Sequence, residues 1–337
     1  MSILNTNQNN NQSHQKDIHR YSFSRFKTFH TCPRKHQYQY VEQLESEESA
    51  VTIPGKLFHK CIQQFLDGED MADTIKEFRT LCTTGKLDLE PDLLEYIVSK
   101  YLQYYAKDYS SEKNLMTEKE FTETIEGDDY ITLIVDQAFE KNNMVTVRDI
   151  KTTTNKLKYT YDDVVHNQQL LLYVPYVENE LSVKVDMVQI DEVRMAKLQD
   201  IPMNNNGKPT ADKRRLELVT YEDYLDLLTQ LNLDTAPEYK HVLEYLKERG
   251  HPLFNRVTAQ VLDPAMISSN AQDMLNTYSN IKHQIDSLQS TGFDSSYRVR
   301  GPLCKYCAYH SLCEYDMHGM TQAERQIIIE DLLKNKS

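Results

Sequence analysis

The chain has 337 residues, of which 26% are charged and 39% hydrophobic, and its net charge at pH 7 is −13. Its apolar runs are too short to cross a membrane, and its polar N-terminus lacks the apolar core of a signal peptide. We therefore expect a cytoplasmic protein with no membrane partner and no structural disulfides. The negative charge argues against a surface coated with nucleic acid, because nonspecific phosphate binding is electrostatic, but it is compatible with a local basic groove.

The N-terminal segment differs from the rest of the chain in composition. Residues 1–17 are rich in Asn and Gln and almost free of apolar side chains, which predicts a disordered tail. Ile18–Val41 has no acidic residue and interleaves cations with aromatic rings. This pattern suits a phosphate backbone and stacked bases, but an amphipathic helix with its rings in the core explains the aromatic residues better. Ser22 is a candidate N-cap, and Cys32-Pro33 predicts a break between two helices.

A helical lobe is predicted to follow this segment. Ile53–Leu66 is amphipathic and can point His59 inward, and Asp73–Ala106 continues with helical periodicity. A lone His in a helix is more often a satisfied core or surface residue than a metal ligand. Leu115–Ile125 is predicted to be a strand that brings Glu120 near the sheet.

Two strands, Tyr130–Glu140 and Met144–Lys151, form the predicted centre of the chain. β-Branched and apolar residues dominate both strands. The Asn142-Asn143 pair between them suits a two-residue turn, because Asn tolerates left-handed backbone geometry. A loop of three or five residues would shift the pairing by one residue and reverse the faces.

With the two-residue turn, Asp136 lies opposite Asp149. Side chains alternate along a strand, so Lys151 shares the face of Asp149 while Ile150 points the other way. Directly opposed acids have Cβ atoms ~5 Å apart and repel each other. The pairing therefore predicts a cation between the two carboxylates.

The second half of the chain alternates helices and strands. Tyr161–Val177 is predicted to be a helix with Gln169 and Tyr173 on one face. Val183–Arg194 resembles an outer strand, and Leu216–Val219 is its expected partner. Further helices are expected over Thr220–Gly250, Pro264–Leu288 and Thr321–Lys334.

Four of the six cysteines are candidates for one metal site. Cys304, Cys307 and Cys313 form a short chelating loop, and Cys32 is the natural fourth ligand. Four thiolates suit either zinc or an iron–sulfur cluster, and the residues alone leave both open. The remaining two cysteines lie in helical patterns and are interpreted as small buried residues: Cys61 and Cys82.

In this order the motifs resemble the RecB-like branch of the PD-(D/E)XK nuclease superfamily, including the CRISPR-associated iron–sulfur exonucleases and the nuclease domain of AddB. The resemblance runs from Ser22 to Tyr315. It rests on SFSRFKTFHTCPRKHQYQYV, Gly55-Lys-Leu-Phe-His59, Ile134-Val-Asp136, Asp149-Ile-Lys151, Gln169-Leu-Leu-Leu-Tyr173 and the loop from Cys304 to Cys313. Each motif is weak alone, but six in the family's order are specific.

The resemblance implies an α/β fold: a restriction-endonuclease-like mixed central sheet flanked by helices, with helical insertions and a C-terminal iron–sulfur loop. It implies one nuclease domain over residues 18–337. Within it we expect a helical lobe at about 55–115, a nuclease core at about 116–195, a mainly helical insertion at about 196–300, and a cluster-binding loop with a C-terminal helix at 301–337.

The resemblance also implies roles for individual residues. The ligands of a Mg²⁺ or Mn²⁺ ion would be His59, Asp136, Asp149 and the carbonyl of Ile150. Lys151, catalytic together with the two acids, would orient water or neutralise developing charge. Gln169 and Tyr173 would position substrate and support the site. The resemblance shifts the cysteine prediction from zinc toward a [4Fe–4S] cluster.

The resemblance thus implies a metal-dependent deoxyribonuclease, an exonuclease that hydrolyses single strands or duplex ends with metal-activated water. The sequence contains no G-x-x-x-x-G-K-[ST] motif, so any helicase or ATPase function must come from a partner. One alternative is an inactive fold that binds DNA ends or scaffolds a recombination complex. Another is an electron-transfer or zinc protein whose carboxylates form a solvated face.

Overall fold

The computed structural model describes residues 18–44, 52–261, 263–291, 298–317 and 321–334. The chain divides into two compact units. The first comprises Met1–Glu47, Phe121–Leu133 and Gln272–Ser337, and the second comprises Glu48–Glu120 and Ile134–Ala271. The predicted tail lies outside the described residues, and the expected domain boundaries stay a prediction.

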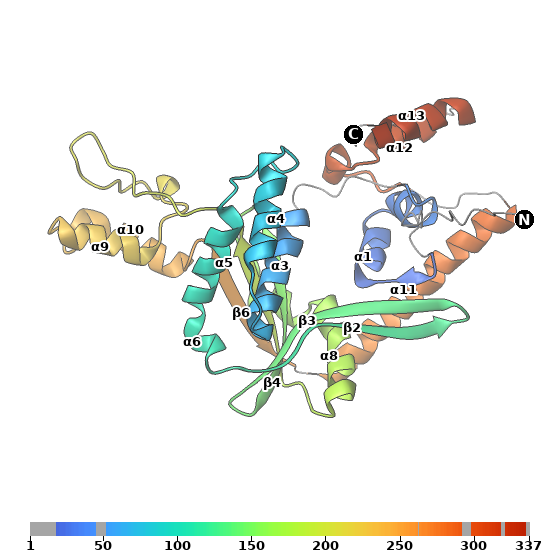
Figure 1. Cartoon of the computed structure of the whole chain (residues 1–337), viewed down its shortest axis with the longest axis horizontal. Coiled ribbons are helices and arrows are strands. Elements are labelled where there is room, and N and C mark those ends of the chain that lie inside the picture. Colours follow the sequence, from blue (N-terminus) through green and yellow to red (C-terminus); the bar gives the residue numbers. More distant parts are fainter. Residues whose placement is uncertain (1–17, 45–51, 262, 292–297, 318–320, 335–337) are drawn as a thin grey trace, which may run out of the picture. The chain divides into compact units, whose positions relative to one another are not determined.

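A mixed sheet forms the centre of the second unit (Figure 1). The end of β3 (Asp129–Lys141) pairs antiparallel with β4 (Met144–Thr153), and β4 pairs parallel with β5 (Met187–Arg194). β5 then pairs antiparallel with β6 (Phe254–Gln260). β2 (Lys113–Glu126) pairs with β3.

Helices cover one face of this sheet as a compact group. α3 (Thr52–Asp67), α4 (Ala72–Thr83) and α5 (Leu93–Tyr104) pack together, and α3 also contacts β4 (Figure 1). Their apolar side chains share one core with Ile150 of β4 and Val193 of β5. The short α6 (Ala106–Tyr109) follows α5.

The opposite face carries α7 (Tyr161–Val165) and α8 (Gln168–Leu181), which form the crossover that a parallel pair of strands requires. α8 contacts β4 and brings Gln169 to Lys151, whose side chain alternates with that of Ile150 along the strand. The expected α/β architecture, a mixed central sheet flanked by helices, is therefore confirmed.

The prediction for the strand at Val183–Arg194 is wrong in one respect. We expected an outer strand, but β5 lies between β4 and β6 and its interior residues are all buried. Its polar residues Gln189, Asp191 and Glu192 are buried as well, each with a hydrogen-bond partner, so the alternation of polar and apolar residues did not mark a solvent-exposed face. The expected partner at Leu216–Val219 is also wrong, because β6 takes that place.

The predicted helix at Tyr161–Val177 is two helices. Thr160 begins α7 through a capping box with Asp163. The side chain of Asn167 then accepts from the backbone N–H groups of Gln169 and Leu170 and begins α8. Pro175 lies inside α8, which continues to Leu181.

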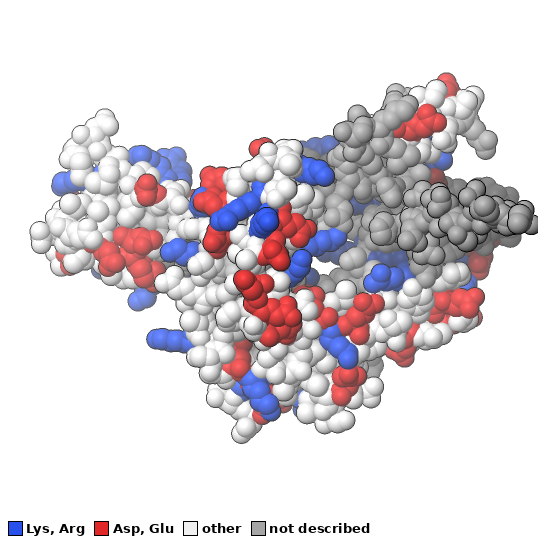
Figure 2. Space-filling view, viewed as in Figure 1, with Lys and Arg blue, Asp and Glu red and all other residues white. Residues whose placement is uncertain are grey.

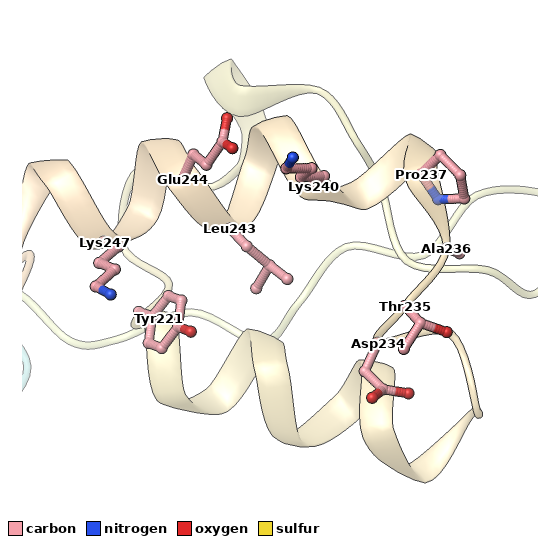
Figure 3. Close-up of a pocket in the computed structure, with 9 residues that line it drawn as sticks. All are labelled: Tyr221, Asp234, Thr235, Ala236, Pro237, Lys240, Leu243, Glu244 and Lys247. Atoms are coloured by element: carbon pink, nitrogen blue, oxygen red, sulfur yellow. The ribbon is translucent and has the colours of Figure 1, made fainter.

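α9 (Tyr221–Gln230) and α10 (Pro237–Arg249) form a helical pair with its own small core, which includes Leu216 and Val219. The 3-10 turn η2 (Lys213–Arg215) precedes this pair. Thr220 caps α9, because its hydroxyl accepts from the Asp223 N–H at 3.0 Å. A cavity of about 420 Å³ lies beside the turn between the two helices, and Leu243 points from α10 toward α9 (Figure 3).

In the first unit, β1 (Arg20–Tyr21) pairs parallel with the start of β3. The later part of α11 (Pro264–Thr291) also belongs to this unit. Its remaining elements are α1 (Phe23–Thr31), α2 (Pro33–His36), the π-helical turn η1 (Gln37–Val41), the 3-10 turn η3 (Pro302–Tyr306), α12 (His310–Met317) and α13 (Gln322–Lys334).

The N-terminal segment Ile18–Val41 is interpreted as a core segment, and the structure confirms this where its aromatic rings are buried. Ser22 caps α1 by accepting from the Arg25 N–H, and Tyr21 and Phe26 are buried. Arg25 is itself buried, lies 4.0 Å from the centre of the Tyr21 ring, and donates to the carbonyl of Arg20. This guanidinium therefore stabilises the fold.

Charged side chains of both signs are interspersed on the face that Figure 2 shows. Over the described residues, none of the helices combines the length and apolarity that a membrane crossing requires.

Candidate functional site

The β3–β4 hairpin has the predicted register. Asn142 and Asn143 have φ values of 53° and 61°, the left-handed geometry of a two-residue turn. The ladder runs from Lys141 opposite Met144 to Gln137 opposite Arg148. One position further, the Asp136 carboxylate accepts the N–H of Ile150 at 2.7 Å. Asp136 therefore lies beside Asp149 at the point where the two strands separate.

α3 brings His59 to this point. Nδ1 of His59 lies 3.5 Å from Oδ2 of Asp136. One turn earlier in the helix, Gly55 lies against Thr152 of β4, and a Cβ at Gly55 would be 2.5 Å from Oγ1 of Thr152. The missing side chain therefore lets α3 approach the strand that carries Asp149.

Glu118 completes this group, and the sequence interpretation missed it. Its Oε1 lies 3.3 Å from Nδ1 of His59, and the residue has a φ of 44° within β2. We expected Glu120 near the sheet, but Glu120 is exposed. An uncommon φ at a non-glycine residue is typical of functional positions. No sequence signal distinguishes Glu118 from Glu120, because the two share one face of a regular strand.

A chain of polar contacts leads from Asp149 to α8. Nζ of Lys151 lies 2.9 Å from Oδ1 and 2.8 Å from Oδ2 of Asp149, and it donates to Oε1 of Gln169 at 2.8 Å. The Gln169 amide in turn donates to the hydroxyl of Tyr173. The structure thus brings together the predicted lysine, glutamine and tyrosine, each held by the next.

Burial and charge crowding shift the pKa values of this group. Burial raises the pKa of Asp149, the Lys151 ammonium opposes this and the Asp136 carboxylate adds to it, so that the value reaches about 6. Burial would lower the pKa of His59, but Asp136 and Glu118 raise it to about 9. Burial also raises the pKa of Asp136, against the lowering effect of His59. The site concentrates negative charge where water is scarce.

The donor set fits a hard divalent cation. His59, Glu118 and Asp136 each offer one ligand atom, and these atoms lie within 4.8 Å of one another. Oδ2 of Asp149 is buried and accepts no hydrogen bond with good geometry, although it faces Lys151. Carboxylate oxygens suit Mg²⁺, and an imidazole ligand shifts the preference toward Mn²⁺.

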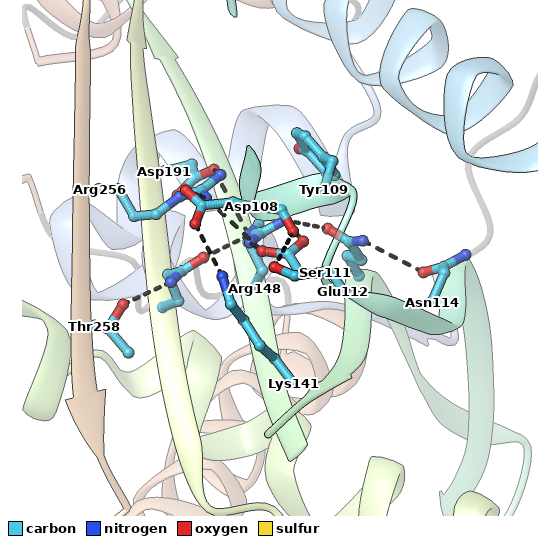
Figure 4. Close-up of polar contacts among 12 residues, drawn as sticks. Asp108, Tyr109, Ser111, Glu112, Asn114, Lys141, Arg148, Asp191, Arg256 and Thr258 are labelled. Atoms are coloured by element: carbon cyan, nitrogen blue, oxygen red, sulfur yellow. Dashed lines mark hydrogen bonds and ion pairs between the residues drawn. The ribbon is translucent and has the colours of Figure 1, made fainter. Parts of the chain in front are cut away.

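A buried ionic network lies on the other face of the same strands (Figure 4). Arg148 donates to both carboxylate oxygens of Glu112, at 2.6 and 3.0 Å, and to Gln137 at 2.7 Å. Asp191 of β5 pairs with Arg256 of β6. Ile150 lies two residues after Arg148 in β4, and its side chain is buried on this face, as predicted. The network holds the strands that carry the site.

The four predicted cysteine ligands border one cavity in the first unit, together with Tyr38 and Arg298. Burial raises the pKa of Cys313, and the neighbouring thiols of Cys32 and Cys307 add to this. All six cysteines are free of disulfides. Among the described residues, no three of these sulfur atoms lie within 4.8 Å of one another.

Comparison with known proteins gives the family. A family model described as the PD-(D/E)XK nuclease superfamily matches residues 20–314. A solved structure titled "Crystal structure of SSO0001" is 14% identical over 89% of this chain and 89% of that chain, with a TM-score of 0.34, a value that does not establish a common fold. No curated protein matches the sequence significantly. Because the family model covers most of the chain, this protein belongs to the PD-(D/E)XK nuclease superfamily and is a nuclease by family.

Proposed function

We propose that this chain is a metal-dependent DNA nuclease of the RecB-like branch, an exonuclease that acts on single strands or duplex ends. The observation that carries the proposal is the convergence of His59, Glu118 and Asp136 with the Asp149–Lys151 pair in one buried, acidic site. Superfamily membership supports phosphodiester hydrolysis as the reaction.

The metal ion would be Mg²⁺ or Mn²⁺. The residues that would hold it are His59, Glu118, Asp136, Asp149 and the carbonyl of Ile150. When bound, such an ion supplies an activated water and stabilises charge on the attacked phosphate.

The other polar residues position a catalytic ammonium. Lys151 lies within hydrogen-bond distance of Asp149, where it would neutralise the charge that develops on the phosphate. Gln169 fixes Nζ of Lys151 from α8, and Tyr173 fixes Gln169. Removing Gln169 should therefore lower the turnover number without weakening substrate binding, because it acts through Lys151.

A [4Fe–4S] cluster held by Cys32, Cys304, Cys307 and Cys313 is the second part of the proposal. The four cysteines border one cavity, which supports a shared site. Four thiolates suit either zinc or a cluster, and the preference for the cluster rests on the family resemblance. Iron and sulfide analysis with visible absorption tests it, and a colourless protein with stoichiometric zinc would refute the cluster while leaving the nuclease proposal intact.

The setting of the reaction is also proposed. Six free cysteines suit a cytoplasmic, reducing compartment. The substrate would be DNA with free ends, and a helicase or recombination partner would supply unwinding.

The nuclease test uses DNA labelled at either end, single-stranded or duplex, with Mg²⁺ or Mn²⁺. We expect the native protein to cleave, and Asp149→Ala and Lys151→Ala to lose activity. Lys141→Ala is a matched control, because Lys141 is 31% exposed against 32% for Lys151 and also pairs with an aspartate. Equal cleavage by all variants would remove the proposed site. DNA binding without cleavage by the native protein would favour an inactive scaffold.

A further inference from the structure

A cavity of about 390 Å³ lies where the segment after β4 meets the start of β6, within the second unit. Its lining comes from the end of α5 at Tyr104, from Leu157–Tyr159, and from residues 249–256. This volume is within the range of ~300–1,000 Å³ typical of sites for small ligands. None of its described lining residues is acidic, which sets it apart from the carboxylate site.

Aromatic rings form one wall of this cavity. The ring of Tyr104 lies 4.5 Å from that of His251, and His251 is stacked on Phe254 at 4.6 Å with an interplanar angle of 5°. Phe254 is buried, whereas Tyr104, whose ring is tilted by 43° to that of His251, is 52% exposed. An exposed aromatic face above packed rings is a surface on which a base can stack.

Two cations give the cavity a positive charge. Lys158 is exposed and has no ion pair among the described residues. Arg249 donates to the backbone carbonyls of Leu216, Glu217 and Val219 and, among the same residues, forms no ion pair, although the Glu217 carboxylate acts on it from further away. A third cation, Arg256, is neutralised by Asp191 and Asp108 (Figure 4). Backbone carbonyls do not neutralise a guanidinium, so Arg249 and Lys158 can attract phosphate.

Tyr159 connects this cavity with the carboxylate site. The N–H groups of Lys158 and Tyr159 donate to the Glu192 carboxylate at 2.7 and 3.1 Å. Glu192 is the β5 residue paired with Lys151, so one short segment links the cavity wall to the catalytic lysine.

We propose that this cavity binds one unpaired nucleotide of a DNA strand whose neighbouring phosphodiester lies at Lys151. The base stacks on Tyr104 and His251, and its phosphate faces Lys158 and Arg249. A base in a duplex is stacked and paired and cannot enter, so the cavity selects single strands. This inference rests on the proposed nuclease function and names the part of the substrate that the enzyme recognises.

The test measures binding in EDTA, where metal-dependent cleavage does not interfere. Fluorescence anisotropy compares a labelled single strand, the same strand as a duplex, and an abasic strand of equal length. The variants are Tyr104→Leu, which removes the ring but keeps an apolar side chain, and Lys158→Glu. The controls are Tyr161→Leu, whose tyrosine is 49% exposed, and Lys184→Glu, an exposed lysine outside the cavity.

We expect Tyr104→Leu to bind the single strand at least about fivefold more weakly, the low end of what a stacked base contributes. The same variant should bind the abasic strand with the affinity of the native protein, because that strand has no base that could stack on Tyr104. Lys158→Glu should weaken binding of both strands, and both controls should bind normally. In cleavage assays the two cavity variants should raise KM and leave kcat unchanged.

Native binding by Tyr104→Leu would overturn the inference, as would an equal loss on the normal and abasic strands. Both results leave the nuclease proposal standing if the native protein cleaves DNA. A native protein that shows the base-dependent binding but cleaves nothing would instead refute the nuclease proposal and retain the cavity as a single-strand binding site.

Discussion

The carboxylate site of the second unit and the cysteine cavity of the first are built in opposite ways. The carboxylates project from strands, and His59 from α3, which packs on these strands over a large apolar core and beside a buried ionic network. The cysteines come from segments about 270 residues apart in the chain, and the local core contains only three buried residues, Tyr38, Tyr309 and Leu312, among those described. The carboxylate site is therefore supported by a larger apolar core than the cysteine cavity.

The two sites therefore differ in what a bound group would contribute to them. Lys151, Gln169 and Tyr173 form a continuous chain of hydrogen bonds, so an ion held by the carboxylates would add chemistry to an existing frame. Around the cysteines, Tyr38 donates to Asp316 at 2.6 Å and Tyr309 to the carbonyl of Leu44 at 2.7 Å. A cluster there would mainly stabilise the fold, because its binding free energy adds to the free energy of folding.

The largest expected effect concerns the buried network around Arg148, compared with the partly exposed ion pairs that Arg325 of α13 forms with Glu42 and Asp316 in the first unit. Arg148→Met should cost ~3–5 kcal/mol of unfolding free energy, because it removes the bidentate partner of the buried Glu112 carboxylate and one of the two cations at Asp191. Arg325→Met in the first unit, where the pair is partly exposed, should cost only ~0–1 kcal/mol. Urea unfolding measures both. Equal costs would contradict the contrast between the units.

The next effect separates catalysis from stability. Asp149→Asn should lower cleavage at least about a hundredfold and leave stability unharmed in EDTA. The pKa of Asp149 is about 6 in the folded protein, above its unfolded value of ~3.9. The protonated carboxyl therefore favours folding, fully so below pH ~3.9, and this contribution to stability is lost as the pH rises through about 6. The native protein should therefore lose stability over this range relative to the variant, as measured by thermal unfolding at several pH values. A variant that is less stable than the native protein at pH 8 would oppose this account.

A smaller effect tests how the frame positions His59. Gly55→Ala should destabilise by ~1–3 kcal/mol and reduce cleavage, because the new Cβ meets Oγ1 of Thr152. The double variant Gly55→Ala/Thr152→Ala should recover much of the loss, since it removes the obstructing hydroxyl. Gly301→Ala, where a Cβ would meet no atom within 4 Å, is the neutral control. No recovery in the double variant would mean that Gly55 acts in some other way.

The smallest effect is the pH dependence of a single ion cluster in the first unit. Burial would raise the pKa of Asp129, but hydrogen bonds from Lys282, His19 and Tyr278 lower it. Its contribution is present above the unfolded pKa of ~3.9 and is lost as pH falls through the lower folded value. Asp129→Asn should cost roughly 1 kcal/mol at pH 7, because Lys282 is 38% exposed, and the difference should vanish in acid. A difference that does not change with pH would show that charge is not its source.

The sequence alone determined the centre of the site because its signals are local. The Asn142-Asn143 turn fixes the register of the hairpin, and the period of two along a strand puts Asp136, Asp149 and Lys151 on one face. Helical spacing likewise put Gln169 and Tyr173 on one face of α8. These relations span a few residues or one turn and need no knowledge of the remaining chain.

Only the tertiary structure decided what reaches this centre from elsewhere. Glu118 enters through a local distortion of β2, and β5 is central because β6 returns from a segment that gave no strand signal. The cavity at Tyr104 depends on segments about 150 residues apart in the chain. Such contacts depend on how distant surfaces pack, and no short stretch of sequence encodes that packing.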